Sequence, residues 1–380
     1  MQYPAWVMKI LPLCALLSLG IQAHTEDATM VPRAGIAEGL NRIINGTMSW
    51  TTSSPLVLPV DNSDGSTHLA YKNPSVVQAN GAWYVIASRK RYLEGKVRHS
   101  LVYFRITDWS KPESSRVVPL FTDEAYTSAP AIFYYTHQHR WYVIFDWKDP
   151  TTGYAGPAFS TFEDIDQPET LTKPQKCFPS IPTSLPKKSG VRWLDPSLIS
   201  DGTRMFMFFT DESGHFLRSS TSLDAFPVGW DDPVVVMSLP TTVLFEGNCT
   251  YRLKDSGKYL TIIEAIAPET KERFYNAFTA DRLDGDWHLI PGGVQRPFAG
   301  SANVTTKDGS AGWSRHISHG ELLRPTNDER MILDPTHLTF LYQGWDMQSR
   351  VTGIPLGPFN GYHEIPYQLA LLESTLSTHK

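Results

Sequence analysis

The chain has 380 residues, a formal net charge of −5, 41% hydrophobic and 12% aromatic residues, and only 19% charged residues. This composition excludes an intrinsically disordered protein, and the slight acidity without long Lys/Arg runs argues against nucleic acid as a partner. The aromatic content suits all-β proteins and proteins that stack against sugar rings.

The N-terminal residues 1–23 have the pattern of a secretory signal peptide. Lys9 supplies a positive charge, and the apolar run 10–21 is too short to span a membrane. Ala23 is a small residue at a position where a signal peptidase would cut. We therefore expect a secreted, extracellular protein with no membrane partner. Residues 24–48 are expected to form a polar segment, and no amphipathic helix longer than two turns is expected anywhere.

Cysteine and glycosylation patterns fit an oxidising compartment. Beyond the signal region, Cys177 and Cys249 could form one disulfide, although the apolar neighbours of Cys249 fit a buried thiol equally well. Acceptor triplets for N-glycosylation begin at Asn45, Asn248 and Asn303. Asn45 is the best candidate because it lies in a polar stretch, whereas Asn248 falls in the expected pocket.

Five segments repeat one pattern, in which a short apolar strand, a polar turn and a β-rich strand follow one another. The second strands of these hairpins begin at Trp83, Trp141, Met205, Tyr259 and Met331. A period of this size, built from strands and turns, predicts propeller blades of about four strands each. A double β-sandwich would not repeat one hairpin motif at this period. We therefore predict an all-β, five-bladed β-propeller over residues 49–375.

In a propeller the first strand of each blade lines the central channel, so the residues just before these strands should meet at one mouth. They are Asn73, Ala129, Asp195, Glu246 and the pair 319–320. Asp195 and Glu246 are lone carboxylates in apolar runs, where a raised pKa would suit a general acid for glycosidic cleavage. A strand cap or a basic partner could explain one such carboxylate, but two at equivalent repeat positions indicate the carboxyl pair of a glycosidase.

Six further motifs carry a resemblance to a known family. They are NGAWYV (80–85), FRITDWS (104–110), SGHFLRS (213–219), LFE (244–246), ISHGE (317–321) and LYQG (341–344). With these motifs the chain resembles glycoside hydrolase family 62, the secreted α-L-arabinofuranosidases with a five-bladed propeller, from about residue 50 to residue 371. Sibling furanosidase families with the same propeller are the nearest alternative. The resemblance implies an inverting enzyme that removes arabinofuranosyl side chains from arabinoxylan or arabinan.

The resemblance also implies roles for residues at the mouth. Glu246 would be the general acid, Asp195 would orient the sugar and tune the pKa of the acid, and Lys72 would help to hold the arabinose. The family has its general base in a Lys-Asp-Pro-Thr motif, where this chain has Asn73. An amide can position water but cannot take its proton near neutral pH, so reduced activity is expected. The same motif occurs literally at 148–151, after the second strand of blade two, where we expect an exposed turn.

Other positions match or depart from the family. Thr127 stands where the family usually has Arg, and Gly247 replaces the usual small residue after the acid. Tyr362 matches a second arabinose-holding position, although an ordinary rim aromatic is the alternative. His319 would lie beside a water-bound cation, with calcium as the expected ion and Gln343 as a weaker candidate near it. A histidine hydrogen-bonded in the core is the alternative for His319.

Three functional hypotheses follow from these residues. The first is the arabinofuranosidase, a monomer acting on polysaccharide, with calcium as its one expected cofactor. The second is a non-catalytic carbohydrate-binding protein that keeps the groove without turnover. A protein-interaction propeller is the third, and it is less favoured because it has no need of Glu246 and Asp195 at the mouth.

Overall fold

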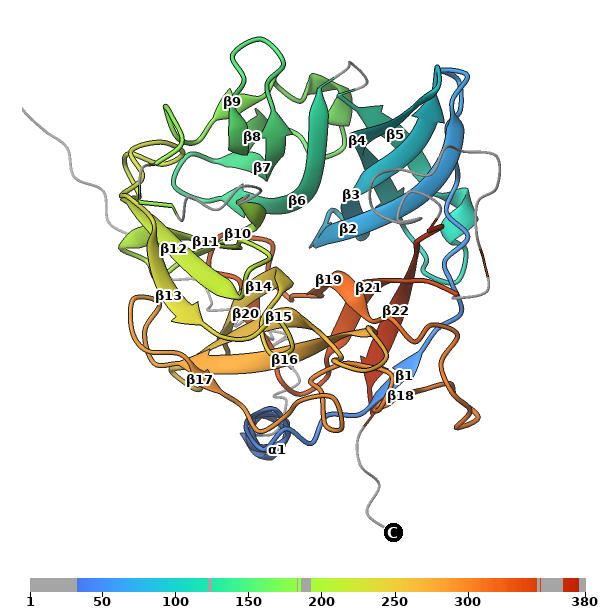
Figure 1. The fold of residues 1–380 in the computed structure, drawn as a ribbon, viewed down its shortest axis with the longest axis vertical. Helices are drawn as coiled ribbons and strands as arrows, with labels where there is room; N and C mark the ends of the chain where they lie inside the picture. The colour runs from blue at the N-terminus through green and yellow to red at the C-terminus, as the bar shows by residue number, and fades with distance from the viewer. Residues whose placement is uncertain are drawn as a thin grey trace, which may run out of the picture. The chain divides into compact units, whose positions relative to one another are not determined.

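The computed structural model describes residues 33–121, 125–182, 184–185, 193–346, 349 and 365–375. In this part of the chain, strands form five sheets of four or five strands arranged around a central axis (Figure 1). Each sheet is one blade, so the predicted all-β, five-bladed propeller is confirmed. The residues 1–23 of the expected signal peptide lie outside the described residues, and secretion stays a prediction.

The first three blades are antiparallel sheets whose four strands follow chain order from the axis outwards. Blade 1 consists of β2 (Thr67–Ala79), β3 (Ala82–Leu93), β4 (Lys96–Ile106) and β5 (Arg116–Leu120). Blade 2 consists of β6 (Tyr126–Tyr135), β7 (Arg140–Lys148), β8 (Ala155–Phe162) and β9 (Gln175–Lys176). Blade 3 consists of β10 (Leu194–Ser200), β11 (Arg204–Thr210), β12 (His215–Ser222) and β13 (Val234–Ser238).

The last two blades recruit strands from elsewhere in the chain. Blade 4 has the order β20-β14-β15-β16-β17, with β14 (Glu246–Leu253), β15 (Tyr259–Ile266), β16 (Arg273–Ala280), β17 (His288–Leu289) and β20 (Ile332–Leu333). Blade 5 combines β19 (Ser318–Leu322), β21 (Thr339–Gly344), β22 (Gln368–Ser374), β1 (Trp50–Thr52) and β18 (Val304–Thr305). The N-terminal strand β1 pairs antiparallel with the C-terminal strand β22 (Figure 1), so the two ends of the propeller chain close the ring in one sheet.

The sequence placed the second strand of blade 5 at Met331, and the structure corrects this. Strand β19 pairs with β21, whereas β20 runs parallel to β14 in blade 4. The segment 325–333 crosses the far ends of the inner strands, where it accepts backbone hydrogen bonds from Tyr134, Ser200 and Arg252. These contacts between blades draw the segment away from its own hairpin, and it covers the end of the channel opposite the starts of the inner strands.

The expected absence of a helix longer than two turns was also wrong. The helix α1 spans Arg33–Ile44, and its Ile43 is 1% exposed within the core of the last blades. Arg42 donates from Nη1 to the Thr375 carbonyl at 3.0 Å. The apolar positions Ile36, Leu40 and Ile43 have helical spacing, but two glycines lower the helix propensity of the segment and obscured it. Within the described chain, no helix is long and apolar enough to cross a membrane.

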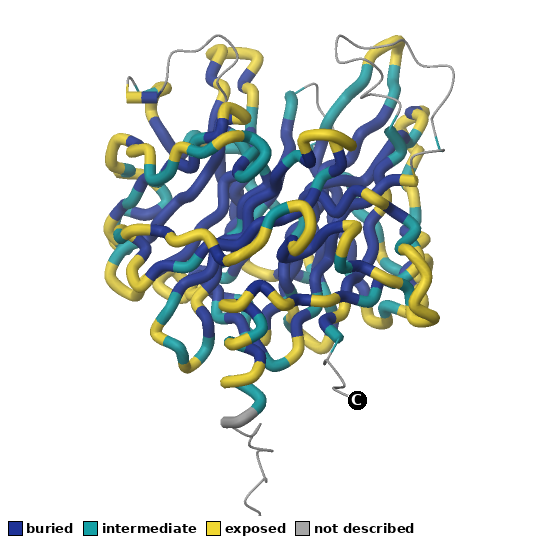
Figure 2. Tube along the Cα trace, turned by 60° about the horizontal axis from the view of Figure 1, so that its bottom comes forward, coloured by how far each residue is buried: buried dark blue, intermediate teal, exposed yellow. Residues whose placement is uncertain are grey.

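The hydrophobic core lies between neighbouring blades rather than in one central cluster. Val77 and Tyr84 of blade 1 pack with Ile132 and Trp141 of blade 2, and similar clusters join the other blades. Inner strands are therefore buried on both faces, whereas the loops at the rim are exposed (Figure 2). This sandwiching explains why β11 is a nearly continuous apolar run without alternation.

The structure shows whether the two cysteines pair and how the three possible glycosylation sites are placed. Cys177 and Cys249 are both free thiols. The Nδ2 atoms that would carry a glycan are already hydrogen-bonded at Asn248, to the Asp195 carbonyl, and at Asn303, to three backbone carbonyls. Asn45 is exposed, so glycosylation at this residue stays a prediction.

Candidate active site

Every inner strand carries the same irregularity near its start. The register with the second strand shifts by one residue in all five blades, which defines a β-bulge in each. The first bulge residues are Asn73, Ala129, Asp195, Gly247 and His319. The first four have positive φ angles of 48°, 51°, 57° and 64°. Residues other than glycine rarely adopt a positive φ. Bulges commonly change the direction of a side chain at functional sites. The five bulges therefore define the mouth of the channel.

The register corrects the placement of Glu246 by one residue. Gly247, not Glu246, occupies the position equivalent to Asn73 and Asp195, and Glu246 lies opposite Glu264 just before the bulge. A glycine suits the positive φ at this place. The apolar run before Glu246 does not reveal where the bulge begins, because the pairing that defines it is made with β15.

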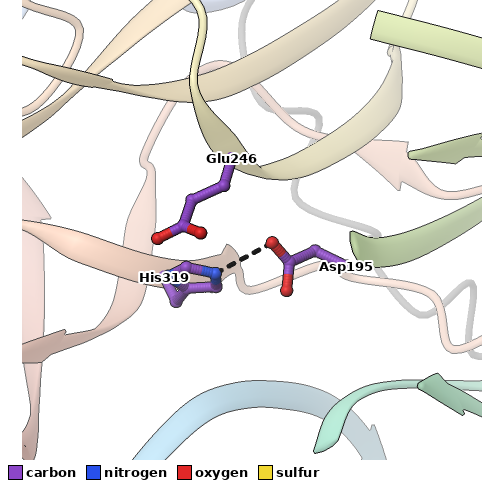
Figure 3. A group of neighbouring side chains, drawn as sticks. All are labelled: Asp195, Glu246 and His319. Carbon is purple, nitrogen blue, oxygen red and sulfur yellow. Dashed lines mark hydrogen bonds and ion pairs between the residues drawn. The ribbon is translucent and has the colours of Figure 1, made fainter. Parts of the chain in front are cut away.

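Three side chains from three blades meet at the mouth. Asp195 on β10, Glu246 on β14 and His319 on β19 each bring one polar atom within 4.8 Å of the others (Figure 3). His319 Nε2 lies 3.0 Å from Asp195 Oδ2, and its Nδ1 lies 3.2 Å from Glu264 Oε2. Burial lowers the pKa of His319, but these two carboxylates outweigh it and hold the pKa well above the usual value. The ring is therefore an imidazolium that donates to both carboxylates.

Arg273 joins the two glutamates of blade 4. Its Nη1 lies 2.8 Å from Glu246 Oε1 and 2.5 Å from Glu264 Oε1, and its guanidinium covers the Phe245 ring at 4.5 Å. Burial is the main cause that raises the pKa of Glu246, with Arg273 opposing it. Burial also acts on Glu264, but Arg273 and His319 overcome it and lower that pKa to about 2.

The pKa of Asp195 is shifted in the opposite direction to that of Glu246. Burial would raise its pKa, but His319 and the Gly247 N–H, which donates to Oδ2 at 2.9 Å, lower it below the usual value. The site therefore holds one carboxyl group that favours its proton and one that favours its charge. Environments that push two neighbouring carboxyl pKa values apart are typical of acid–base catalysts.

A ring of second-strand side chains fixes the bulges, and we call it the interblade clamp. Its members lie opposite the residues that precede the bulges: Ser88, Asp146, Thr210, Glu264 and Gln343. Four of them accept the backbone N–H of the bulge residue in the next blade: Ala129 on Ser88 (2.9 Å), Asp195 on Asp146 (3.3 Å), His319 on Glu264 (2.9 Å) and Asn73 on Gln343 (2.8 Å). Thr210 is the exception, because the Gly247 N–H donates to the Asp195 carboxylate instead.

The residues predicted beside a cation are occupied by protein groups. Gln343 accepts the Asn73 N–H and donates from Nε2 to Ser318 Oγ at 3.1 Å. Both nitrogens of His319 face carboxylates and its raised pKa keeps both protonated. These donor sets do not fit a calcium ion held directly by either side chain. The expected cation near His319 is one bound through water, and it stays a prediction beside the alternative of a hydrogen-bonded core histidine.

The bulge residues surround a cavity of about 50 Å³ at the mouth. Asn73, Ala129, Asp195, Gly247 and His319 all line it. Asn73 is 8% exposed, and its Oδ1 is buried without a hydrogen-bond partner. The structure thus brings Asn73 and Asp195 to one cavity and Glu246 to the cluster beside it.

The remaining predictions from the sequence concern Lys72, Tyr362 and the literal motif at 148–151. Lys72 precedes the bulge of blade 1, is buried, and has its Nζ 5.8 Å from the centre of the Tyr367 ring. Tyr362 lies outside the described residues. The literal motif at 148–151 begins at the last residue of β7 and continues into a turn. Asp149 is buried rather than exposed, and its Oδ1 accepts the Thr151 N–H.

Asp146, Glu264 and Arg273 lie at the site but are not among the residues predicted for it. Asp146 and Glu264 are lone carboxylates inside apolar strands, which is the same sequence signal that identifies Asp195 and Glu246. Arg273 has no such signal, because it stands at the start of β16 among ordinary loop residues. Only the packing of β16 against β15 brings its side chain to the acids.

Comparisons with known proteins agree with this geometry. The family model described as glycosyl hydrolase family 62 matches residues 49–372. Alpha-L-arabinofuranosidase C of Cellvibrio japonicus is 31% identical over 330 residues, which are 86% of this chain and 47% of that protein. The chain therefore spans about half the length of this relative.

Solved structures give the same picture. The catalytic domain of a GH62 α-L-arabinofuranosidase from Coprinopsis cinerea has a TM-score of 0.76 at 32% identity, covering 86% of this chain and 97% of that one. An α-L-arabinofuranosidase from Podospora anserina, solved with cellotriose, has a TM-score of 0.76 at 30% identity, covering 88% and 98%. A thermostable family-43 glycoside hydrolase, with a TM-score of 0.53 at 11% identity, shares the fold alone.

Proposed function

The chain belongs to glycosyl hydrolase family 62, and from this membership we propose that it is an inverting α-L-arabinofuranosidase of reduced activity. Its substrates are arabinofuranosyl side chains of arabinoxylan or arabinan. The observation that carries the proposal is the pair of neighbouring carboxyl groups with opposite pKa shifts, Glu246 and Asp195.

Glu246 is the general acid of the proposed reaction. Its raised pKa keeps a proton that passes to the glycosidic oxygen as the bond to the arabinose carbon breaks. The bond from Arg273 to Oε1 orients the carboxyl group and leaves Oε2 for the leaving group. Asp195 stays ionised beside His319 and opposes the positive charge that develops on the sugar ring.

Asn73 occupies the place of the general base. In an inverting enzyme the base activates a water molecule on the face of the sugar opposite the acid. The buried Oδ1 of Asn73 lines the cavity and can hold such a water, but an amide takes no proton from it. Loss of general-base help lowers the rate by roughly 10²–10⁴-fold.

Substrate contacts and secretion complete the proposal. Lys72 and Tyr362 hold the arabinose, and residues 1–23 direct the chain out of the cell, so that Asn45 can be glycosylated. A calcium ion near His319 could be held only through water, as the direct donors are occupied, and no step of the reaction is assigned to it.

A non-catalytic carbohydrate-binding protein is the second candidate. The departures at Asn73 and Thr127 favour it, because both side chains are buried at the blade-1 and blade-2 side of the mouth and leave a polar atom without a partner. Such a protein would keep the sugar pocket while lacking the proton acceptor.

The test compares arabinose release from wheat arabinoxylan by the native chain, Asn73→Asp and Asn73→Ala. We expect slow release by the native chain and a gain of about 10²-fold in Asn73→Asp, since the two side chains are nearly isosteric. Asn73→Ala is the matched control and should show no gain. Binding of arabinose-bearing xylo-oligosaccharides without turnover in the native chain and in Asn73→Asp would favour the second candidate.

A further inference from the structure

A second cavity, larger than the one at the mouth, lies between blades 4 and 5 and takes no part in the mechanism described so far. Its volume is about 410 Å³, which is within the range of sites that hold small ligands. Residues from three loops line it: 267–272 between β15 and β16, 294–304 after β17, and 311–315 before β19. We call it the side cavity.

The side cavity lies on the same face of the propeller as the mouth. In β15, Glu264 lies opposite Glu246 at the mouth and the strand ends at Ile266, so the loop that follows stands at the mouth end of blade 4. Residues 311–315 lead into β19, whose bulge at His319 is part of the mouth. Glu272 in the lining directly precedes Arg273, which lies 2.8 Å from Glu246 Oε1. The side cavity therefore begins next to the proposed acid.

One wall of the side cavity is fixed by a buried carboxylate. Glu272 is 8% exposed, and its Oε1 accepts from Arg315 Nε while its Oε2 accepts from Ser301 Oγ at 2.8 Å. Burial would raise the pKa of Glu272, but these partners lower it. Both oxygens are engaged and a guanidinium stands beside them, so this wall disfavours a cation.

Three other polar groups of the lining are available to a ligand. In the part of the chain that the structure describes, no group hydrogen-bonds to the side chains of Glu269 and Gln295 or to the two terminal nitrogens of Arg315, and all three residues are exposed. A carboxylate, an amide and a guanidinium together supply the donors and acceptors that sugar hydroxyl groups need. None of the described lining residues is aromatic, so a sugar would be held by its hydroxyl groups rather than by stacking.

The charges of the lining favour a neutral sugar over an acidic one. Glu269 and Glu272 are acidic, and the one basic side chain, Arg315, is already paired with Glu272. Lys271 is not in the lining, and its Nζ donates to the Pro268 carbonyl at 2.7 Å. The carboxylate of a uronic acid would therefore meet Glu269 without a free cation to balance it, and such like-charge contacts select against a ligand.

We propose that the side cavity binds a neutral sugar substituent of the same polysaccharide whose arabinose occupies the mouth. The inference rests on the proposed function. A general acid protonates the oxygen that joins the arabinose to the polymer, so the polymer lies on the side of Glu246. Blade 4 carries both this acid and the wall of the side cavity, and a neighbouring side group of the polymer can therefore reach it. The preferred substrate is then a polymer with several neutral side groups.

The first test removes two of the available groups, in the variant Glu269→Ala/Gln295→Ala. It compares kcat/KM on densely substituted wheat arabinoxylan with kcat/KM on an aryl arabinofuranoside, which has no polymer to fill the side cavity. The ratio should fall about fivefold or more, mainly through KM, because hydrogen bonds to the polymer are lost. Glu113→Ala is the matched control, since Glu113 is also exposed but lies in the short helix η1 (Pro112–Ser114), which follows β4 at the opposite face. Parallel measurements in Asn73→Asp keep the test independent of weak native turnover.

The second test separates charge from hydrogen bonding. Glu269→Gln keeps a polar side chain and removes the negative charge. Its rate on arabinoxylan that also carries uronic acid groups, relative to its rate on neutral arabinoxylan, should rise by about twofold or more at low salt, and the gain should shrink as salt screens the charge.

Several results would overturn the inference. An unchanged ratio in the double variant would mean that the side cavity holds no part of the substrate, and equal losses on both substrates would make its groups structural only. No gain for Glu269→Gln on the acidic polymer would remove the preference for a neutral sugar. If neither the native chain nor Asn73→Asp releases arabinose, the proposed activity fails, and retention in arabinoxylan-containing gels then decides. Weaker retention of the double variant than of the native chain would still support the side cavity, whereas equal retention or none in either protein would reject it.

Discussion

The two sides of the mouth differ in how their polar groups are satisfied. Blades 3, 4 and 5 supply a connected network of charged side chains, namely Asp195, Glu246, Glu264, Arg273 and His319. Blades 1 and 2 supply three buried side chains that each keep a polar atom without a partner, namely Asn73, Thr127 and Asp146. The network side carries the proposed acid, and the other side carries Asn73 and Thr127, the positions of the proposed departures from the family. The hydroxyl of Thr210 in blade 3 also lacks a partner, so buried polar atoms without partners are concentrated in, but not restricted to, the half of the site proposed to handle the attacking water.

Removal of the acid should have the largest effect. Glu246→Gln cannot protonate the leaving oxygen, so arabinose release from arabinoxylan should fall by about 10³-fold. An aryl arabinoside with a good leaving group needs less help and should lose much less. Initial rates on the two substrates measure the difference. Similar small losses on both would remove Glu246 from this role.

Breaking the network at its centre should be the largest effect on stability. His319→Gln leaves Asp195 and Glu264 buried without their shared cation, and the loss of one partner from a buried charge network costs about 3–5 kcal/mol. Urea unfolding measures the loss. His316→Gln is the control, because burial lowers the pKa of His316 and keeps that ring neutral. A loss for His319→Gln no greater than for His316→Gln would mean that the network does not depend on the imidazolium.

The same histidine predicts a pH dependence of stability. Its folded pKa is raised, so its contribution is fully present below the unfolded value of about 6.5 and is lost as the pH rises through the folded value. The stability difference between the native chain and His319→Gln should therefore be larger at pH 6 than at pH 10. Urea unfolding of both proteins at the two pH values tests this, and a constant difference would contradict a raised pKa.

Backbone strain at the bulges should give the smallest effect. In Gly247→Ala the new Cβ would lie 3.4 Å from Glu264 and His319 at a φ of +64°, so the main cost is the left-handed backbone, about 1–2 kcal/mol. Ala129 already has a φ of +51° on the other side of the mouth, and Ala129→Gly should relieve its strain. Thermal unfolding should show melting temperatures that shift in opposite directions, or by clearly unequal amounts, in the two variants. Equal destabilisation of both variants would argue against backbone strain as the cause.

Much of the architecture was readable from the sequence because it is local. Alternation of apolar strands and polar turns predicted the first hairpin of blades 1 to 4, and lone carboxylates in apolar runs identified Asp195 and Glu246. The same signal is present at Asp146 and Glu264. The helix α1 was missed because two glycines weaken its pattern.

The sequence by itself determined the number of blades, the residues that approach the axis, and the amide at position 73. Each depends on residue identity and on spacing within a few dozen positions. Only the tertiary structure decided that Gly247 and not Glu246 starts the bulge, that β20 joins blade 4, and that β1 closes blade 5. It also decided which groups share His319 and Arg273. These features arise from pairing and packing between segments far apart in the chain, and such contacts are chosen by the free energy of the whole assembled ring, which no local pattern encodes.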